Sequence, residues 1–390
     1  MDSAPKSRNT GTRFFPESLD QRLDRLSESF QRRSLAPRVG IDFSSNDYLG
    51  LSQDTALRKR ILLRMQDVES GASGSRLLRG QIPLFNEVEE NLARFSGGEA
   101  ALLFPSGYQA NLALLSGILS AEDWVFSDQL NHASLIDGMR LSRARRVVYR
   151  HRDVGALRRE LQESSSHSGL KVIVTESLFG MDGDTAPLLA LADLAGEFSA
   201  LLVVDEAHAT GLWGDGQRGG GLVQSLGLSS RVFATIHTGG KALGTGGAWV
   251  SGSAKLKDYL VNFSRPFIFS TAPLPALAVA LDESVSYWKH VGPARAASLF
   301  KGADRLRESL SSFGLQSFEP GPIVPVLLGE NQVALRVAEK LQEVGFDVRA
   351  IRPPTVPEGT ARLRLCVHWD HSLEILLRLS ERLQEFGRKN

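Results

Sequence analysis

The stretch Leu201-Leu202-Val203-Val204-Asp205-Glu206-Ala207-His208 places four apolar residues directly before two acids and a histidine. An apolar run without alternation is typical of a strand covered on both faces of a parallel sheet. Ionisable groups at the end of such a strand need a reason, because burying them is costly unless they are paired. Open parallel sheets bind ligands beyond the carboxyl ends of their strands. We therefore interpret Asp205 and His208 as candidate site residues at a sheet edge.

Further apolar runs of the same kind alternate with helical stretches along the chain. The predicted strands are residues 101–104, 172–175, 201–204, 232–236 and 248–250. The predicted helices between them include residues 86–95, 108–119 and 154–162. Repeated strand–helix order of this kind predicts an α/β fold with a mostly parallel central sheet.

The alternation of predicted strands and helices stops after Pro273. Residues 274–313 have helical character, and a smaller α/β segment follows, with strands near 323–328 and 362–367 around a helix at 332–343. The spacing of Leu19, Leu23, Leu26 and Phe30 predicts a helix near the start of the chain. We predict three parts: an N-terminal tail and helix (1–44), a large cofactor-binding domain (45–280) and a small C-terminal α/β domain (281–390).

Composition limits the classes of function. The chain has 390 residues, and 45 Lys and Arg against 44 Asp and Glu give a net charge of +1, which argues against nucleic acid as a partner. The one cysteine, Cys366, excludes an intrachain disulfide and favours a reducing, cytoplasmic compartment. No apolar run approaches the ~18 residues of a membrane span, and residues 1–13 lack the apolar core of a secretory signal.

Three more strand ends carry notable residues. After strand 101–104 come Pro105-Ser106-Gly107-Tyr108 and a helical run, and a helix start of this kind is a natural phosphate site. After strand 232–236 come His237-Thr238-Gly239-Gly240-Lys241, and burial can make such a lysine a nucleophile by lowering its pKa. Strand 172–175 leads into Glu176 and the turn Met181-Asp182-Gly183-Asp184.

Each of these features alone has a commoner explanation. The glycine turn can be a plain strand-to-helix connection, the acids a solvated loop, and the lysine an exposed turn residue. Together, a phosphate cradle, a carboxylate, a histidine and a lysine are the parts that a pyridoxal phosphate enzyme requires. We therefore predict pyridoxal 5'-phosphate as the cofactor and no metal.

Longer sequence runs carry a resemblance that covers residues 15–385 in one order. The chain resembles the α-oxoamine synthase family of fold-type-I pyridoxal phosphate enzymes. The matching runs are Phe43-Ser44-Ser45-Asn46-Asp47-Tyr48-Leu49-Gly50-Leu51, Gly74-Ser75-Arg76-Leu77, Asn131-His132-Ala133-Ser134-Leu135, Met181-Asp182-Gly183-Asp184, Asp205-Glu206-Ala207-His208-Ala209-Thr210-Gly211, Gly240-Lys241, Ile351-Arg352-Pro353-Pro354-Thr355-Val356-Pro357 and Arg362-Leu363-Arg364-Leu365.

The resemblance implies a role for each matching residue. Lys241 would bond covalently to the cofactor, Asp205 would pair with its ring nitrogen, His208 would bind its phenolic oxygen and His132 would stack on the ring. Lys241, His132 and Asp205 are thus the expected catalytic residues. The phosphate would be held by Gly107, Tyr108 and Thr238. The substrate would be bound by Arg364 at its carboxylate, and by Asn46, Thr355, His132 and an arginine of the N-terminal helical segment, for which Arg33 is our choice.

Two positions depart from the family pattern. Gly180 replaces the usual serine, so that one side-chain contact to the cofactor is absent or replaced by the backbone. The lysine segment reads Thr-Gly-Gly-Lys where close relatives have Thr-Phe-Gly-Lys. Neither change removes a group that the chemistry requires.

The resemblance also implies a reaction and an assembly. We expect a decarboxylative condensation of L-alanine with a pimeloyl thioester of coenzyme A or acyl carrier protein, a step of biotin biosynthesis, in a homodimer with its active sites at the subunit boundary. The alternative is a sister condensation of glycine or serine, giving 5-aminolevulinate, 2-amino-3-oxobutanoate or a sphingoid base. The prolines at 353 and 354 could direct Thr355 toward the substrate, and this favours the first reaction.

Other classes explain the sequence less well. Asp205-Glu206-Ala207-His208 also matches the acidic box of a helicase, but Gly240-Lys241 is followed by Ala242 rather than the Ser or Thr of a phosphate loop. The dinucleotide-like run 214–219 does not directly follow a strand, so we interpret it as a loop. His368-Trp369-Asp370-His371 is interpreted as a surface turn rather than a metal site. A non-enzymatic binding module would not need Lys241, Asp205 and His208 at strand ends.

Overall fold

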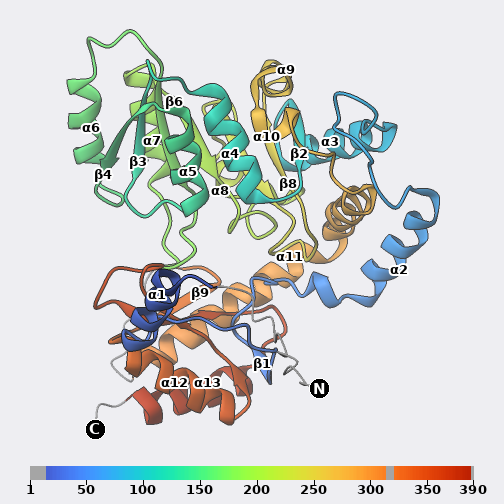
Figure 1. Cartoon of the computed structure of the whole chain (residues 1–390). Helices are drawn as coiled ribbons and strands as arrows, with labels where there is room; N and C mark the ends of the chain where they lie inside the picture. The colour runs from blue at the N-terminus through green and yellow to red at the C-terminus, as the bar shows by residue number, and fades with distance from the viewer. Residues whose placement is uncertain (1–14, 313–319, 388–390) are drawn as a thin grey trace, which may run out of the picture.

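The computed structural model describes residues 15–312 and 320–387, and its central element is a seven-stranded sheet of order β2-β8-β7-β6-β5-β3-β4 (Figure 1). The strands are β2 (Ala100–Phe104), β3 (Trp124–Asp128), β4 (Arg145–Tyr149), β5 (Lys171–Glu176), β6 (Leu201–Asp205), β7 (Ala234–Thr238) and β8 (Ala248–Gly252). Only β8 runs antiparallel to its neighbours, β2 and β7. The prediction of an α/β fold with a mostly parallel sheet is confirmed.

Two strands of this sheet, β3 and β4, were not predicted from the sequence. The strand β3 ends in the polar residues Ser127 and Asp128, and β4 begins with Arg145 and Arg146. The strand β4 lies at the edge of the sheet, and most of its residues are not buried. An edge strand does not need apolar residues on both faces, so β4 has no continuous apolar run.

Helices cover both faces of this sheet. One face packs against α4 (Gly107–Ile118), α5 (Ala133–Ser142) and α9 (Ala254–Phe263). The other face packs against α3 (Pro83–Ser96), α6 (Val154–Glu163) and α7 (Leu188–Glu197). Successive residues of β6 show the alternation, since Val203 packs on the α4 side while Leu202 and Val204 pack on the α7 side. This double cover accounts for the continuous apolar run that decides the fold.

A second group of elements lies toward the C-terminus. A three-stranded antiparallel sheet has the order β11-β12-β9, and a parallel pair joins β1 to β10. Their bounds are β1 (Ile41–Asp42), β9 (Ile323–Gly329), β10 (Phe346–Asp347), β11 (Ala350–Ile351) and β12 (Ala361–Cys366). These strands pack against α12 (Asn331–Glu343) and α13 (Leu373–Gly387).

The long helix α11 (Pro275–Ser312) belongs to both cores (Figure 1). Its residue Leu281 is in one apolar cluster with Trp249 of the large sheet, and its Leu306 is in another with Leu363 of β12. Phe43, which lies before the predicted large domain, also packs in the second cluster. The predicted boundary at 280 falls inside α11. The three-part division stays a prediction, and residues 1–14 of its N-terminal tail lie outside the described residues.

The remaining elements are short or peripheral. They are α1 (Glu17–Glu28), α2 (Thr55–Arg64), α8 (Leu222–Ser225), α10 (Arg265–Ile268) and the 3-10 turns η1 (Leu51–Gln53) and η2 (Met65–Asp67). Across residues 15–312 and 320–387, none of the helices combines the length and the apolar character that crossing a membrane requires.

Candidate active site

Three neighbouring parallel strands end together and carry the predicted chemistry. Glu176 at the end of β5 lies opposite Asp205 at the end of β6, and Asp205 lies opposite Ile236 of β7. Lys241 follows β7 after a short glycine turn. The register of the sheet therefore brings two carboxylates and one amine to the same edge.

Lys241 has the environment of a reactive amine. Its burial lowers the pKa to about 8, although the nearby carboxylates of Asp205 and Glu176 oppose that change. An amine with such a pKa is partly neutral near pH 7, while an exposed lysine is almost fully charged. Lys241 can therefore act both as a nucleophile and as a base.

Asp205 is held by two donors in the interior. Asn111 of α4 donates from Nδ2 to Oδ2 of Asp205 over 2.7 Å, and the backbone N–H of Ala207 donates to Oδ1 over 2.8 Å. The same Asn111 nitrogen donates to Oγ of Ser134 over 2.8 Å. Sequence reasoning missed Asn111 because its partner is far away in the chain. Two fixed donors therefore hold the carboxylate in one orientation.

Glu176 is a second carboxyl group, which the sequence analysis placed at a strand end without assigning it a role. It is buried, and burial together with the charge of Asp205 raises its pKa to about 8. Its Oε1 accepts the backbone N–H of His132 over 2.7 Å. Its position directly after an apolar strand is the same sequence feature that indicated Asp205 as a site residue. Glu176 is thus placed to hold His132 and to act electrostatically on Lys241.

His132 caps the N-terminus of α5. Its Nδ1 accepts the backbone N–H of Ser134 over 3.2 Å, so the proton of the neutral ring is on Nε2. Burial lowers the pKa of His132, and the positive charge of Lys241 lowers it further against the opposing effect of Asp205. A neutral ring with a free Nε2–H can stack on a flat ligand and donate one hydrogen bond.

The predicted phosphate site lies at the start of α4. Ser106 caps this helix by accepting the backbone N–H of Gln109 over 3.3 Å. A Cβ built on Gly107 would lie 3.8 Å from Cβ of Thr238, so the helix start faces the end of β7. Tyr108 is 43% exposed and donates its hydroxyl to Asp137, while its ring lies edge-on to His132 at 6.4 Å. The first turn of α4 with Thr238 suits an anion.

A chain of polar contacts connects His208 to Arg364. Tyr48 lies 2.8 Å from Nδ1 of His208 and donates its hydroxyl to Oδ1 of Asn46 over 3.1 Å. The same Asn46 oxygen accepts Nη2 of Arg364 over 3.1 Å, and Nη1 of Arg364 donates to the carbonyl of Gly180 over 3.1 Å. The structure therefore joins four predicted site residues through Tyr48, whose role the sequence did not indicate.

Arg364 has no acidic partner in the described part of the chain. The ion pairs found there do not include it, whereas the adjacent Arg362 on β12 pairs with Asp182. The partners of Arg364 are carbonyl and amide oxygens and the thiol of Cys366, none of which is a carboxylate. A partly buried guanidinium of this kind favours an anionic ligand. This arrangement suits the carboxylate of an amino acid.

Arg33 and Thr355 meet across a large distance in sequence. Nη2 of Arg33 donates to Oγ1 of Thr355 over 3.0 Å. Arg33 lies beyond the end of α1 at Glu28, so it belongs to the segment after the N-terminal helix and not to the helix itself. Arg352 is also close, since the charge of Arg33 adds to burial in lowering its pKa. Two neighbouring guanidinium groups favour a second anion-binding position.

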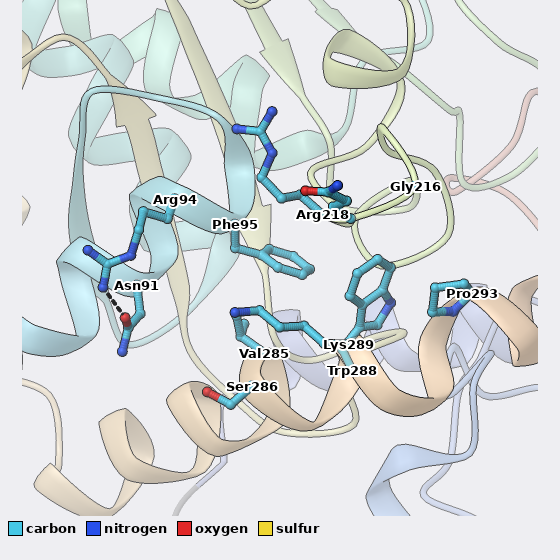
Figure 2. A pocket seen from close by; sticks show the side chains of 11 residues that line it. Asn91, Arg94, Phe95, Gly216, Arg218, Val285, Ser286, Trp288, Lys289 and Pro293 are labelled. Carbon is cyan, nitrogen blue, oxygen red and sulfur yellow. Dashed lines mark hydrogen bonds between the residues drawn. The ribbon is translucent and has the colours of Figure 1, made fainter.

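Two motifs from the sequence lie away from these residues. The run 214–219 forms a loop, as interpreted, and its residues Gly216, Gln217 and Arg218 line a 530 Å³ pocket between α3 and α11 (Figure 2). The lining of this pocket includes none of the predicted site residues. Arg218, which reaches over Phe95 in Figure 2, is paired with Asp215 through Nε over 2.7 Å.

The histidine motif near the C-terminus differs from the expected surface turn. His368 is buried and His371 is half-buried, and their rings stack at 5.0 Å with an angle of 14°. Ligand atoms of these two residues and of Asp370 lie within 4.8 Å of one another. Each ring already uses a nitrogen within the protein, since Nδ1 of His371 accepts the backbone N–H of His368 over 3.2 Å and Nε2 of His368 lies 3.3 Å from the carbonyl oxygen of Ser45. The absence of a metal cofactor stays a prediction.

The residues at the strand ends fit pyridoxal phosphate. The start of α4 and Thr238 can hold its phosphate, Asp205 can pair with a protonated ring nitrogen, and Lys241 has the lowered pKa of a covalent attachment point. The oxygen Oδ1 of Asn111 is buried and has no hydrogen-bond partner within the described chain, which leaves an acceptor beside Asp205 for a bound group.

Comparisons with known proteins agree with this fit. The family model for aminotransferase class I and II matches residues 38–383. An 8-amino-7-oxononanoate synthase of Lysinibacillus sphaericus is 40% identical over 348 residues, which cover 89% of this chain and 88% of the relative. A serine palmitoyltransferase from S. paucimobilis with bound PLP–myriocin superposes with a TM-score of 0.87 at 26% identity, covering 95% of this chain and 97% of that one.

A solved 8-amino-7-oxononanoate synthase from Francisella tularensis has a TM-score of 0.76 at 28% identity and covers 89% of this chain and 97% of its own. Of the two solved structures, the palmitoyltransferase thus has the higher TM-score. The relative from Lysinibacillus has a higher sequence identity to this chain than either of them. Enzymes that catalyse sister reactions share this fold, so sequence identity, rather than backbone similarity, distinguishes between the two activities. The chain belongs to the aminotransferase class I and II family of pyridoxal phosphate enzymes and, within it, to the 8-amino-7-oxononanoate synthases.

Proposed function

We propose that this chain condenses L-alanine with a pimeloyl thioester of coenzyme A or acyl carrier protein to give 8-amino-7-oxononanoate, carbon dioxide and the free thiol, as a step of biotin biosynthesis. The observation that carries the proposal is the meeting of Lys241, Asp205 and Glu176 at one sheet edge, next to the phosphate-type start of α4. The relatives that share about 40% of the sequence support the choice of reaction.

Lys241 and Asp205 would carry the central chemistry. When bound, pyridoxal phosphate supplies an electron sink that stabilises negative charge at the α-carbon of the amino acid. Lys241, with a pKa of about 8, can remove the α-proton and later return a proton to the product. Asp205, oriented by Asn111, would pair with the cofactor's ring nitrogen and favour its protonated form, which withdraws electrons more strongly.

His132 and Arg364 would position the reactants. The free Nε2–H of His132 can donate to the thioester carbonyl or to the amino acid carboxylate. Arg364 binds the carboxylate that is later lost as carbon dioxide, and Asn46 holds its guanidinium in place. His208, neutral because burial lowers its pKa well below the usual range, would hold the phenolic oxygen of the cofactor.

The far end of the acyl chain would meet a second anion site. A pimeloyl group carries a terminal carboxylate, which fatty acyl groups lack. Arg33 and Arg352 lie close enough for the charge of one to lower the pKa of the other, and Arg33 is oriented by Thr355. A carboxylate between them would relieve this repulsion, so the pair supports a dicarboxylic acyl substrate.

An apolar patch supports the proposed homodimer. Leu78 is 83% exposed and Phe269 is 72% exposed, on two segments joined by a backbone hydrogen bond from Ala272 to Gly74 over 2.9 Å. Exposed apolar side chains on neighbouring segments are typical of a protein interface. We expect the patch to be covered by a second copy of this chain, in the cytoplasm, without a nucleic acid or membrane partner.

A matrix of amino acids against acyl thioesters tests the function. L-alanine, glycine and L-serine would each be combined with pimeloyl, palmitoyl, succinyl and acetyl thioesters, with thiol release and product mass as readouts. We expect the highest kcat/KM for alanine with the pimeloyl thioester. The backbone likeness to serine palmitoyltransferase makes serine with palmitoyl thioester the second candidate, and a higher kcat/KM for that pair would replace the assignment.

A further inference from the structure

Gly180 lies directly against the ring of His208. A Cβ built on Gly180 would lie 2.3 Å from Nε2 of His208 and 2.9 Å from both Cδ2 and Cε1. These distances are shorter than real side chains allow, so any other residue at position 180 would displace something. The backbone of Gly180 is not in the left-handed region, and a side chain is therefore excluded by space rather than by conformation.

The ring of His208 is held on its other side by Tyr48. The hydroxyl of Tyr48 lies 2.8 Å from Nδ1 of His208 and 3.1 Å from Oδ1 of Asn46. Nδ1 is therefore engaged by Tyr48, and Nε2 is the ring nitrogen on the side of Gly180. Tyr48 is fully buried and cannot follow the ring if it moves.

The backbone around Gly180 is held as well. Arg364 donates to the carbonyl of Gly180 over 3.1 Å. The neighbouring Phe179 donates its N–H to the carbonyl of Asp184 and accepts the N–H of Gly183, both over 2.9 Å. Asp184 is bound in turn by Nε2 of His151 over 2.8 Å. The loop thus cannot retreat from His208 without breaking several hydrogen bonds.

These contacts form a closed cycle of five residues. The carbonyl of Gly180 binds Arg364, and Arg364 binds Asn46. Asn46 contacts Tyr48, and Tyr48 contacts His208, whose ring lies against Gly180. A side chain at 180 would therefore disturb both the cofactor-side histidine and the arginine of the substrate site.

We propose that Gly180 is the positioning residue of His208: the missing side chain at 180 leaves the space that the imidazole occupies, and this placement sets the position of the ring relative to the cofactor's phenolic oxygen. The side-chain contact that a serine at position 180 would provide is absent in this chain, where glycine leaves room for the histidine ring. The packing part of the inference stands on the geometry alone, and its consequence for the cofactor rests on the proposed function.

A double-mutant cycle tests the packing. The variants are Gly180→Ala, His208→Ala and the double variant, with Gly71→Ala as control because a Cβ on Gly71 meets nothing within 4 Å. At fixed protein and cofactor concentration, G180A should lower the Tm of the holoenzyme by at least about 3 °C in the parent but by less than about 1 °C in the H208A background. An equal loss in both backgrounds, or no loss in the parent, would overturn the inference.

The positioning role has its own readout. The pH midpoint of the cofactor's visible absorbance in the holoenzyme should shift in G180A by at least about half a pH unit, because the partner of the phenolic oxygen has moved. The midpoint should stay unchanged in G71A. An unchanged midpoint in G180A would reduce Gly180 to a packing residue and overturn the positioning role. A parent protein that gains no visible absorbance with pyridoxal phosphate would instead contradict the proposed function, and the Tm cycle would still decide the packing.

Discussion

Glu176 and Asp205 lie opposite each other at the ends of two neighbouring parallel strands, and both act on the charge of Lys241. Two carboxyl groups so close cannot both ionise without cost, and burial with the charge of Asp205 raises the pKa of Glu176 to about 8. Asp205 is held by two hydrogen-bond donors, the side chain of Asn111 and the backbone N–H of Ala207. The pair thus places one carboxylate in a fixed orientation and one titrating carboxyl group beside the lysine.

Glu176→Gln should shift the pH profile of kcat to lower pH. The negative charge of Glu176 raises the pKa of Lys241, so its removal lowers that pKa below about 8 and makes the base available in more acidic solution. We expect a shift of roughly half to one pH unit, together with a loss of rate from the weaker hold on His132. A profile that is unchanged or shifted to higher pH would contradict this electrostatic role.

Arg33→Ala should raise the KM for the pimeloyl thioester by ~10-fold or more with little change in kcat, because a charged hydrogen bond contributes ~1.5–3 kcal/mol. The variant should also lose the preference for pimeloyl over heptanoyl thioester, which has the same length without the terminal carboxylate. Arg38→Ala is the matched control, since Arg38 is an exposed residue of the same segment. Equal KM changes for the two acyl groups would place the terminal carboxylate elsewhere.

Leu78→Asp should convert the dimer to monomers in sedimentation velocity. A charge on the proposed apolar patch would have to be buried without a partner in the dimer. Leu189→Asp is a control at another exposed leucine, on α7, and should leave the sedimentation coefficient unchanged. An active monomer in the parent protein would rule out the proposed assembly.

His151 should give the protein a pH-dependent stability. It lies 2.8 Å from both Asp128 and Asp184, and these two partners raise its pKa to about 9 against the opposing effect of burial. Because the folded pKa exceeds the unfolded value of 6.5, the stabilisation is complete below pH 6.5 and is lost as the pH rises through about 9. His151→Gln should flatten the decrease in unfolding free energy between these pH values, measured by denaturation with urea. A parent protein whose stability is constant over this range would disprove the ion pairs.

The sequence predicted the parts of the site that depend on sheet geometry. Lys241, Asp205 and His208 follow apolar strands, and the carboxyl ends of parallel strands meet at one edge, so their proximity follows from the order of strands and helices alone. The catalytic or cofactor-binding role expected for each of these residues stays a prediction.

The contacts between distant segments could not be predicted in the same way. Asn111 on α4 and Tyr48 near the N-terminus reach Asp205 and His208 only through the tertiary packing, and no spacing in the chain indicates them. The fit of Gly180 against His208 is likewise visible only in three dimensions. The edge strand β4 was missed for a related reason, since its exposure removes the apolar run that marks the inner strands.

Reduction with borohydride followed by peptide mapping tests the central claim most directly. The protein would be loaded with pyridoxal phosphate, reduced, digested and analysed for a pyridoxyl-lysine. The account predicts a single labelled peptide that contains Lys241, because this lysine has a lowered pKa and lies at the strand ends beside Asp205. A label on another lysine, or no label after loading, would contradict it.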